Sequence, residues 1–141
     1  RISQTELNLQ ESDMSLKDQI HILVVDDMST SRGLIVQALE AMGIKNIHHA
    51  ASGAEAVEVM ARQPAHLVLS DYNMPGMDGI QLLKQIRTNA KTKGVGFILI
   101  TGKADKEIVD SGKALGMNNF IKKPFGPQDL KSCLEAVVGR L

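Results

Sequence analysis

The sequence has few of the features that would place a protein outside the cell, in a membrane or on nucleic acid. Its one cysteine, Cys133, excludes an internal disulfide bond and favours a reducing compartment, so we expect a cytoplasmic protein. Basic and acidic residues number 16 each, which leaves no basic excess for binding nucleic acid. No apolar run approaches the roughly 18 residues of a membrane span, and no signal peptide is apparent. Cysteine and histidine do not cluster as in zinc sites.

The N-terminal segment differs from the rest of the chain. Residues 1–13 are polar and show no clear periodicity, whereas Met14 is suited to begin a protein. We expect residues 1–13 to be a vector-derived or disordered extension. A native tail, or a peptide that binds the domain, is the alternative. The folded domain is expected to span residues 14–141.

From residue 21 onward, short apolar runs alternate with segments of helical periodicity. The predicted strands are residues 22–25, 46–50, 67–70, 95–100 and 118–121. The predicted helices are residues 29–42, 53–62, 79–89, 105–115 and 127–138. Strict alternation with short connections predicts a parallel sheet covered on both faces. We therefore expect an α/β, flavodoxin-like (βα)5 doubly wound fold with strand order 2-1-3-4-5.

Several residues carry expectations about packing. Cys133 falls on the apolar side of the last helix and is expected in the core. Gly33 lies inside the first long helix, where it costs about 1 kcal/mol relative to alanine, and indicates either close packing or tolerance. The basic loop 91–94 is expected to be solvated. One face of the first helix is predicted to be buried: Leu34, Ile35, Ala38, Leu39 and Met42.

Polar or charged side chains directly follow four of the predicted strands. Asp26 and Asp27 follow the first, Asp71 the third, Thr101 the fourth and Lys123 the fifth. Because the carboxyl ends of parallel strands share one edge of the sheet, we expect these residues to lie together. Singly, each has an ordinary structural role, as a helix-terminal acid, turn residue, cap or surface lysine. Three acids and one cation gathered at one edge of the sheet indicate a functional site rather than four separate structural roles.

The chemistry of such a site favours phosphoryl transfer. Carboxylates roughly 5 Å apart repel by about 3 kcal/mol per pair at an effective dielectric near 20, and a divalent cation removes that penalty. Mg²⁺ is usually held by one or two carboxylates together with water. A metal ion and a lysine that converge on a carboxylate suit phosphoryl transfer, with Asp71 as the nucleophile that forms an aspartyl-phosphate. Thr101 and Lys123 would then contact phosphoryl oxygens.

These residues stand in motifs that resemble response-regulator receiver domains, and most of all the single-domain chemotaxis type (CheY-like). The resemblance covers residues 18–141. Four segments carry it, together with the spacing between them: ILVVDDMSTSR, LVLSDYNMPGMDG, ILITGK and NNFIKKPF.

The resemblance implies a Mg²⁺ site, with Mn²⁺ as a substitute ion, and a phospho-acceptor at Asp71. Asp27 would bind the ion directly and Asp26 mainly through water, with the backbone carbonyl of Asn73 as a further ligand. The switch hydroxyl would be Thr101.

The resemblance also makes Lys123 the phosphate-binding lysine, makes the Lys123–Pro124 bond a candidate cis peptide, and makes Phe120 the switch aromatic. Phe120 replaces the tyrosine of the best-known chemotaxis members, so no hydroxyl accompanies its inward rotamer. Gly102 stands where a small residue such as alanine is usual. Asn73 and Lys103 flank the access to the phosphate and are expected to influence its lifetime. Lys103 either reaches over the site or is simply solvated.

The resemblance implies a signalling protein rather than an enzyme, one that catalyses only its own phosphorylation and autodephosphorylation. A histidine kinase of the CheA type would donate the phosphoryl group, and the surface of the last two helices and last strand would change shape. The flagellar motor switch is the expected target, a phosphatase is a further partner, and a monomer is expected. Because the sequence ends at Leu141, we expect output through a protein partner. A phosphate sink, or a stand-alone receiver in another phosphorelay, is the alternative.

Two other classes fit less well. A haloacid-dehalogenase-type phosphatase has a second acid two residues after its nucleophile, where this sequence has Asn73. A flavin binder would have a phosphate-binding loop after the first strand, but Asp26 and Asp27 would repel a phosphate there. The sequence also has no tryptophan and a single tyrosine to flank a flavin.

Overall fold

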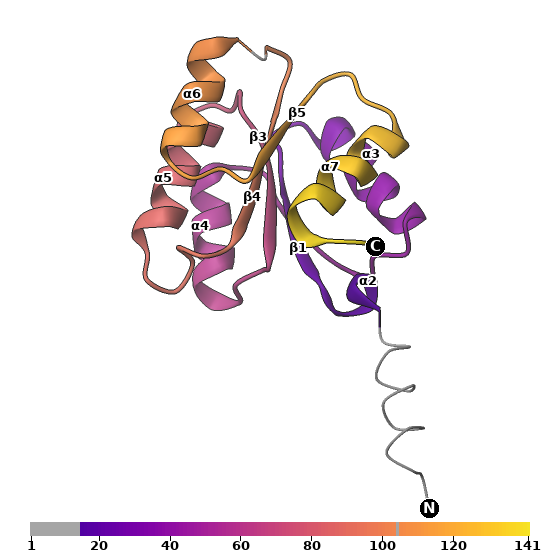
Figure 1. The fold of residues 1–141 in the computed structure, drawn as a ribbon. Coiled ribbons are helices and arrows are strands. Elements are labelled where there is room, and N and C mark those ends of the chain that lie inside the picture. Colours follow the sequence, from indigo (N-terminus) through magenta and orange to yellow (C-terminus); the bar gives the residue numbers. More distant parts are fainter. Residues whose placement is uncertain (1–14, 104) are drawn as a thin grey trace, which may run out of the picture.

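Five parallel strands form one sheet in the order β2-β1-β3-β4-β5, which confirms the predicted topology (Figure 1). The structure is a computed structural model, and it describes residues 15–103 and 105–141. The predicted extension over residues 1–13, with its boundary at Met14, lies outside the described residues. The strands are β1 (His21–Val25), β2 (Asn46–Ala50), β3 (Leu67–Asp71), β4 (Gly96–Thr101) and β5 (Asn119–Lys122).

Helices cover both faces of the sheet. α3 and α7 lie on one face, and α4, α5 and α6 lie on the other (Figure 1). The described helices are α2 (Leu16–Gln19), α3 (Ser29–Ala41), α4 (Gly53–Arg62), α5 (Gly79–Thr88), α6 (Lys106–Ala114) and α7 (Pro127–Val138). The single turn α2 was not predicted, because four residues are too few to show a helical period. Within residues 15–103 and 105–141, no helix has the length and apolar character needed to cross a membrane.

The alternation of side chains along β1 shows why the sheet is buried on both sides. Ile22 and Val24 pack in the core on the α3 and α7 face, while Leu23 and Val25 pack in the core on the α4 to α6 face. All four are fully buried. A central parallel strand therefore has a continuous apolar sequence.

Three strands, β3, β4 and β5, each end one residue later than predicted, and for the first two this changes the place of a site residue. β3 includes Asp71 and β4 includes Thr101, since Asp71 pairs with Ile100 and Thr101 pairs with Lys122. The ladder continues because Tyr72 N–H donates to the carbonyl of Ile100 at 2.8 Å. Two of the predicted site residues consequently stand on the rigid last positions of strands rather than in loops.

The predicted buried face of α3 is wrong at Leu34. Ile35 and Leu39 are buried, but the Leu34 side chain is 63% exposed. One residue is about 100° of helical rotation, so Leu34 is turned away from the sheet when Ile35 faces it. A Cβ added at Gly33 would meet no atom of the described residues within 4 Å, so tolerance, not close packing, explains that glycine.

The loop over residues 91–94 is only partly solvated. Lys91 and Lys93 are exposed, but Thr92 is buried and its hydroxyl donates to the carbonyl of Ile86 at 2.7 Å. That carbonyl belongs to the last turn of α5, whose acceptors have no partner within the helix. Thr92 therefore caps α5, which the composition of the loop does not indicate.

The assignment of Cys133 to the core is confirmed, and it carries a testable consequence. Cys133 is 9% exposed, its Sγ lies 3.7 Å from the carbonyl oxygen of Phe120, and burial raises the pKa of the thiol. Because the thiolate is the reactive form, we expect the folded protein to react with Ellman's reagent at pH 8 far more slowly than the urea-unfolded chain. Equal rates for the two states would contradict a buried Cys133.

Candidate functional site

Three acidic side chains converge at the carboxyl edge of the sheet. Asp26 and Asp27 follow β1, Asp71 ends the neighbouring strand β3, and one carboxylate oxygen of each lies within 4.8 Å of the others. Asp26 and Asp71 are buried, while Asp27 is exposed. The three carboxylates therefore lie together at one edge of the sheet, as expected from their positions after the strands. Charges of one sign held this close favour a bound cation.

The buried carboxylate of Asp26 is the strongest indication that a cation would be stable at this site. Its Oδ1 accepts a hydrogen bond from the backbone N–H of Met28 at 3.0 Å, which fixes the carboxylate. Its Oδ2 is buried and accepts no hydrogen bond from the described residues, and the Nζ of Lys123 lies 3.6 Å away as its ion-pair partner. A buried carboxylate oxygen that accepts no hydrogen bond is costly, so a cation bound beside it would stabilise the site. The three oxygen donors suit a hard cation such as Mg²⁺.

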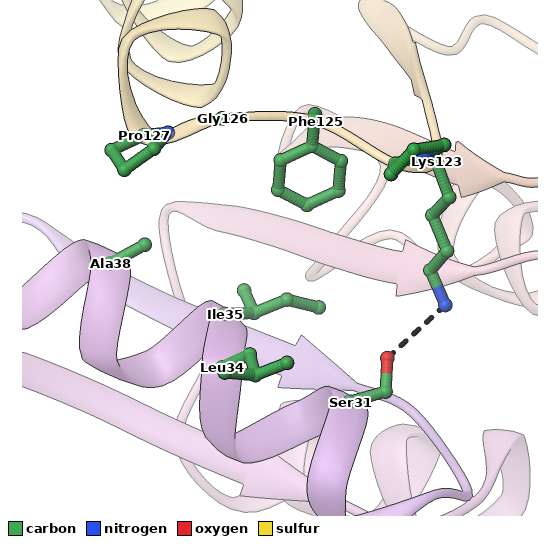
Figure 2. A pocket seen from close by; sticks show the side chains of 9 residues that line it. Ser31, Leu34, Ile35, Ala38, Lys123, Phe125, Gly126 and Pro127 are labelled. Carbon is green, nitrogen blue, oxygen red and sulfur yellow. Dashed lines mark hydrogen bonds between the residues drawn. The ribbon is translucent and has the colours of Figure 1, made fainter.

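Lys123 brings one positive charge to this cluster. Its Nζ lies 3.1 Å from Oδ1 of Asp71 and donates to the Oγ of Ser31 at 3.2 Å, the bond that Figure 2 shows. The backbone N–H of Lys123 donates to the carbonyl of Thr101 at 2.8 Å, which anchors the residue to the end of β4. The Lys123–Pro124 peptide bond is cis, as the resemblance implies.

The environment of Asp71 raises the pKa of its carboxyl group. Burial is the largest cause, and the neighbouring Asp26 and Asp27 add to it, while the ion pair with Lys123 opposes the shift. The charged form of Asp71 therefore depends on Lys123 and on any cation bound beside it.

The hydroxyl of Thr101 is engaged with its own loop. Its Oγ1 donates to the carbonyl of Lys103 at 2.9 Å and accepts from the N–H of Lys103 at 3.0 Å. Thr101 is buried, whereas Gly102 and the Lys103 side chain are exposed. In this arrangement, the hydroxyl holds the β4–α6 loop and would have to leave it to reach a group on Asp71.

The other predicted residues lie around this centre. Asn73 is exposed in the loop after β3, and Phe120 is half-buried on β5, packed against the core under α4 to α6. A groove of about 390 Å³ opens beside Lys123, between α3 and the loop that joins β5 to α7, and Leu34 and Phe125 contribute to its apolar lining (Figure 2).

Three residues at the site were not predicted to belong to it from the sequence. Ser31 lies inside the predicted helix 29–42 and was given no role at the site, but its hydroxyl accepts a hydrogen bond from the Nζ of Lys123. Ser70 donates its hydroxyl to the backbone carbonyl of Asp71 at 2.9 Å. The sequence feature that could have indicated this role is a single hydroxyl residue in an otherwise apolar predicted strand. A Cβ on Gly79 would lie 2.6 Å from that same carbonyl oxygen, so only glycine fits there.

Comparison with known proteins agrees with this geometry. The model of the response regulator receiver domain family matches residues 22–135. A probable chemotaxis protein CheY of Rhizobium etli is 44% identical over 128 residues, which is 91% of this chain and 99% of that protein. The chemotaxis protein CheY1 of Helicobacter pylori is 40% identical over 84% of this chain and 96% of its own length.

Solved structures show the same likeness. Vibrio cholerae CheY4 superposes with a TM-score of 0.80 at 29% identity, covering 84% of this chain and 98% of that one. The receiver domain of the sensor histidine kinase PA1611 of Pseudomonas aeruginosa superposes with a TM-score of 0.77 at 27% identity, covering 86% and 98%. Its structure has a magnesium ion coordinated in the active site cleft. With the fold, the acidic cluster and the relatives in agreement, this chain belongs to the response regulator receiver domain family, as a CheY-like chemotaxis member.

Proposed function

We propose that this protein accepts a phosphoryl group from a histidine kinase on Asp71. The observation that carries the proposal is the Asp71 carboxylate, held at 3.1 Å by the Nζ of Lys123 within a cluster of three acids, in which a buried oxygen of Asp26 accepts no hydrogen bond from the described residues. A histidine kinase of the CheA type is the expected donor, because the relatives are chemotaxis proteins.

The residues that would hold Mg²⁺, or Mn²⁺ in its place, are those of the acidic cluster. Asp27 and Asp71 would bind it directly, Asp26 mainly through water, and the carbonyl of Asn73 would complete the protein ligands. The ion would offset negative charge on the phosphoryl group as transfer proceeds.

In the transfer step, a carboxylate oxygen of Asp71 attacks phosphorus while the bond from phosphorus to the kinase's histidine nitrogen breaks. The electron pair of that bond stays on the imidazole, which then takes up a proton from solvent. Lys123 moves from pairing with Asp71 to pairing with a phosphoryl oxygen. In autodephosphorylation, water attacks phosphorus, the bond from phosphorus to the Asp71 oxygen breaks with its electron pair left on the carboxylate, and inorganic phosphate leaves as the water's proton passes to solvent. Asn73 and Lys103 flank the path of that water and would set the phosphoryl lifetime.

Phosphorylation would then change a distant surface. The new group carries about −1.5 to −2 charge and three acceptor oxygens in place of the single negative charge of the Asp71 carboxylate, and these oxygens attract the hydroxyl of Thr101 away from Lys103. Phe120 would turn into the space that Thr101 leaves, and the α6, β5 and α7 surface would change shape. A shift from 1:99 to 99:1 needs about 5.5 kcal/mol of differential interaction. A few charge-assisted hydrogen bonds at about 1.5–3 kcal/mol each supply that amount.

We expect Thr101→Ala to accept a phosphoryl group with unchanged stoichiometry but to lose most of the gain in partner affinity. In the phosphorylated state the hydroxyl would exchange its bonds with Lys103 for a charge-assisted hydrogen bond to the phosphoryl group, which favours that state by about 1.5–3 kcal/mol. The phosphorylation-dependent gain should therefore fall about 10-fold to 150-fold. Thr88→Ala, which removes an exposed hydroxyl from α5, is the control. An unchanged gain in Thr101→Ala would disprove the coupling through this hydroxyl.

The output we propose is a contact with the flagellar motor switch, made by a cytoplasmic monomer and ended by autodephosphorylation or a phosphatase. A phosphate sink for the chemotaxis kinase, or a receiver in another phosphorelay, is the alternative. Binding of purified motor switch protein to the phosphorylated chain distinguishes them, with Asp71→Asn as the control. Tighter binding on phosphorylation supports motor control, whereas unchanged or absent binding favours a sink.

A further inference from the structure

Histidine side chains gather at the opposite end of the sheet from Asp71. His21 begins β1, His48 lies in β2, and His66 immediately precedes β3 and donates its backbone N–H to the carbonyl of His21 at 2.9 Å. Two residues further along each strand, Leu23, Ala50 and Val68 all pack in the core under α4 and α5. By the two-residue alternation of strands, the three imidazoles therefore share that face of the sheet.

Two of these imidazoles present nitrogen atoms to each other. The Nδ1 of His21 and the Nε2 of His48 are 3.0 Å apart, and the two rings are nearly parallel, with an interplanar angle of 9° and centroids 5.2 Å apart. Both side chains are partly exposed. Only one proton fits between two nitrogens at this distance, so in the neutral pair one nitrogen is unprotonated and accepts the hydrogen bond, and a cation that replaced this proton would find a lone pair on both nitrogens.

His66 packs beside His21 but does not provide a third ligand. Its Nδ1 accepts the backbone N–H of His21 at 2.9 Å, so the proton of the neutral ring is on Nε2. Neither nitrogen of His66 is then available to a cation. Its ring is tilted by 57° against that of His21, with centroids 5.7 Å apart, and limits how far His21 can turn.

We propose that the Nδ1 of His21 and the Nε2 of His48 form a second cation site, for a late first-row transition metal ion such as Cu²⁺, Ni²⁺ or Zn²⁺. Two nitrogens at about 2.0–2.1 Å from one ion are separated by about 2.8–3.4 Å for coordination angles between 90° and 109°. The observed 3.0 Å lies within that range and near its right-angled end, the geometry of neighbouring ligands around Cu²⁺ or Ni²⁺. Water would occupy the remaining positions.

The two cation sites differ in ligand chemistry, so they select different ions. The Asp26, Asp27 and Asp71 cluster offers only oxygen donors, which suit Mg²⁺, whereas imidazole nitrogens suit Cu²⁺, Ni²⁺ and Zn²⁺. The ligands His21 and His48 also belong to paired strands, with Leu23 opposite His48 in the register. A bound ion would tie the edge strand β2 to the centre of the sheet and stabilise the folded state by mass action.

The test is Cu²⁺ binding to the full chain in excess Mg²⁺, followed by electron paramagnetic resonance and by calorimetry. We expect one equivalent of Cu²⁺ with nitrogen coordination and a raised melting temperature. His21→Gln and His48→Gln should each weaken binding by at least about tenfold, since even outer-shell changes cost that much. His49→Gln is the matched control, because His49 is the exposed neighbour of His48 and points to the other face. Asp27→Asn controls for the oxygen site.

Loss of the nitrogen-coordinated signal in His21→Gln and His48→Gln, but not in the two controls, would support the site. Absence of such a signal in the unmodified chain, its survival in either variant, or its loss in a control would overturn it. Because the variants could fail to fold, a second measurement, chemical modification of histidines, uses the unmodified chain. Cu²⁺ should protect His21 and His48, but not His49, from diethyl pyrocarbonate, and equal modification with and without the ion would also overturn the proposal. Neither result depends on whether Asp71 is phosphorylated.

Discussion

Replacing Lys123 with methionine is expected to slow phosphorylation of Asp71 by about 10-fold to 150-fold. The ammonium group lies 3.1 Å from Asp71 and 3.6 Å from Asp26, and it is the cation paired with both acids. A charge-assisted hydrogen bond of about 1.5–3 kcal/mol would be lost from the transition state, and about 1.36 kcal/mol corresponds to tenfold in rate. Methionine keeps the unbranched stem, so the packing beside Ser31 changes little.

Lys122→Met is the matched control for this experiment. Lys122 precedes Lys123 on the chain, but its side chain is exposed, so its loss should leave the rate of phosphorylation by acetyl phosphate unchanged. The pH profile supplies a second readout. Lys123 lowers the pKa of Asp71 against the effect of burial, so in Lys123→Met the pKa should rise and the rising limb of the rate should move to higher pH. Equal rates and profiles in the two variants would show that Lys123 has no electrostatic role.

Replacing Gly79 with alanine is expected to destabilise the fold by about 1–3 kcal/mol, and by more if the backbone cannot yield. The added Cβ would lie 2.6 Å from the carbonyl oxygen of Asp71, 2.7 Å from Cδ1 of Leu99 and 2.9 Å from Cα of Tyr72. Two of these atoms belong to the backbone that positions the phospho-acceptor, so they cannot rotate away. The variant should therefore also be phosphorylated more slowly than the unmodified chain.

Gly33→Ala makes the same chemical change with the opposite expected sign. Gly33 lies within α3, and a Cβ there would meet no atom within 4 Å in the part of the chain that the structure describes, so alanine should stabilise the fold by about 1 kcal/mol. Urea unfolding of both variants measures the two effects on one scale. A neutral Gly79→Ala would mean that the turn from β3 into α5 has more freedom than its contacts indicate.

The strands and the carboxyl edge could be predicted from the sequence because they depend on local patterns. A continuous apolar run bounded by polar residues marks a buried parallel strand, and the residue after it must lie at the shared edge. That reasoning placed Asp26, Asp71 and Lys123 together. Its error of one residue at the ends of β3 and β4 has a physical cause, since the ladder can continue through a polar residue when its backbone is paired.

What could not be predicted depends on contacts between distant segments. Leu34 looks like a core residue by helical spacing, but it lies beside a groove instead of the sheet. Arg87 gives no signal in the sequence, yet its guanidinium donates to the carbonyls of Lys93, Val95 and Gly116 and to Oδ1 of Asn118. These bonds join α5 to the segments that lead into β4 and β5.

The candidate site shows the same division. The types and order of its charged residues are apparent from the motifs, but the hydroxyl groups that orient them are not. Ser31 supports Lys123 from α3, which is 92 residues away along the chain. The bonding of Thr101 to Lys103 also follows only from the loop conformation. The roles of Thr101 and Phe120 in switching remain predictions for the experiments above.

The central claim, a phosphoryl group carried on Asp71, is tested most directly by intact mass spectrometry. The protein and its Asp71→Asn variant are incubated with acetyl phosphate, with and without Mg²⁺. One phosphoryl adduct that needs Mg²⁺, survives acid, is lost in base and is missing from Asp71→Asn is the expected result. No adduct on the unmodified protein, or an adduct that persists in Asp71→Asn, would contradict the assignment of this residue as the phospho-acceptor.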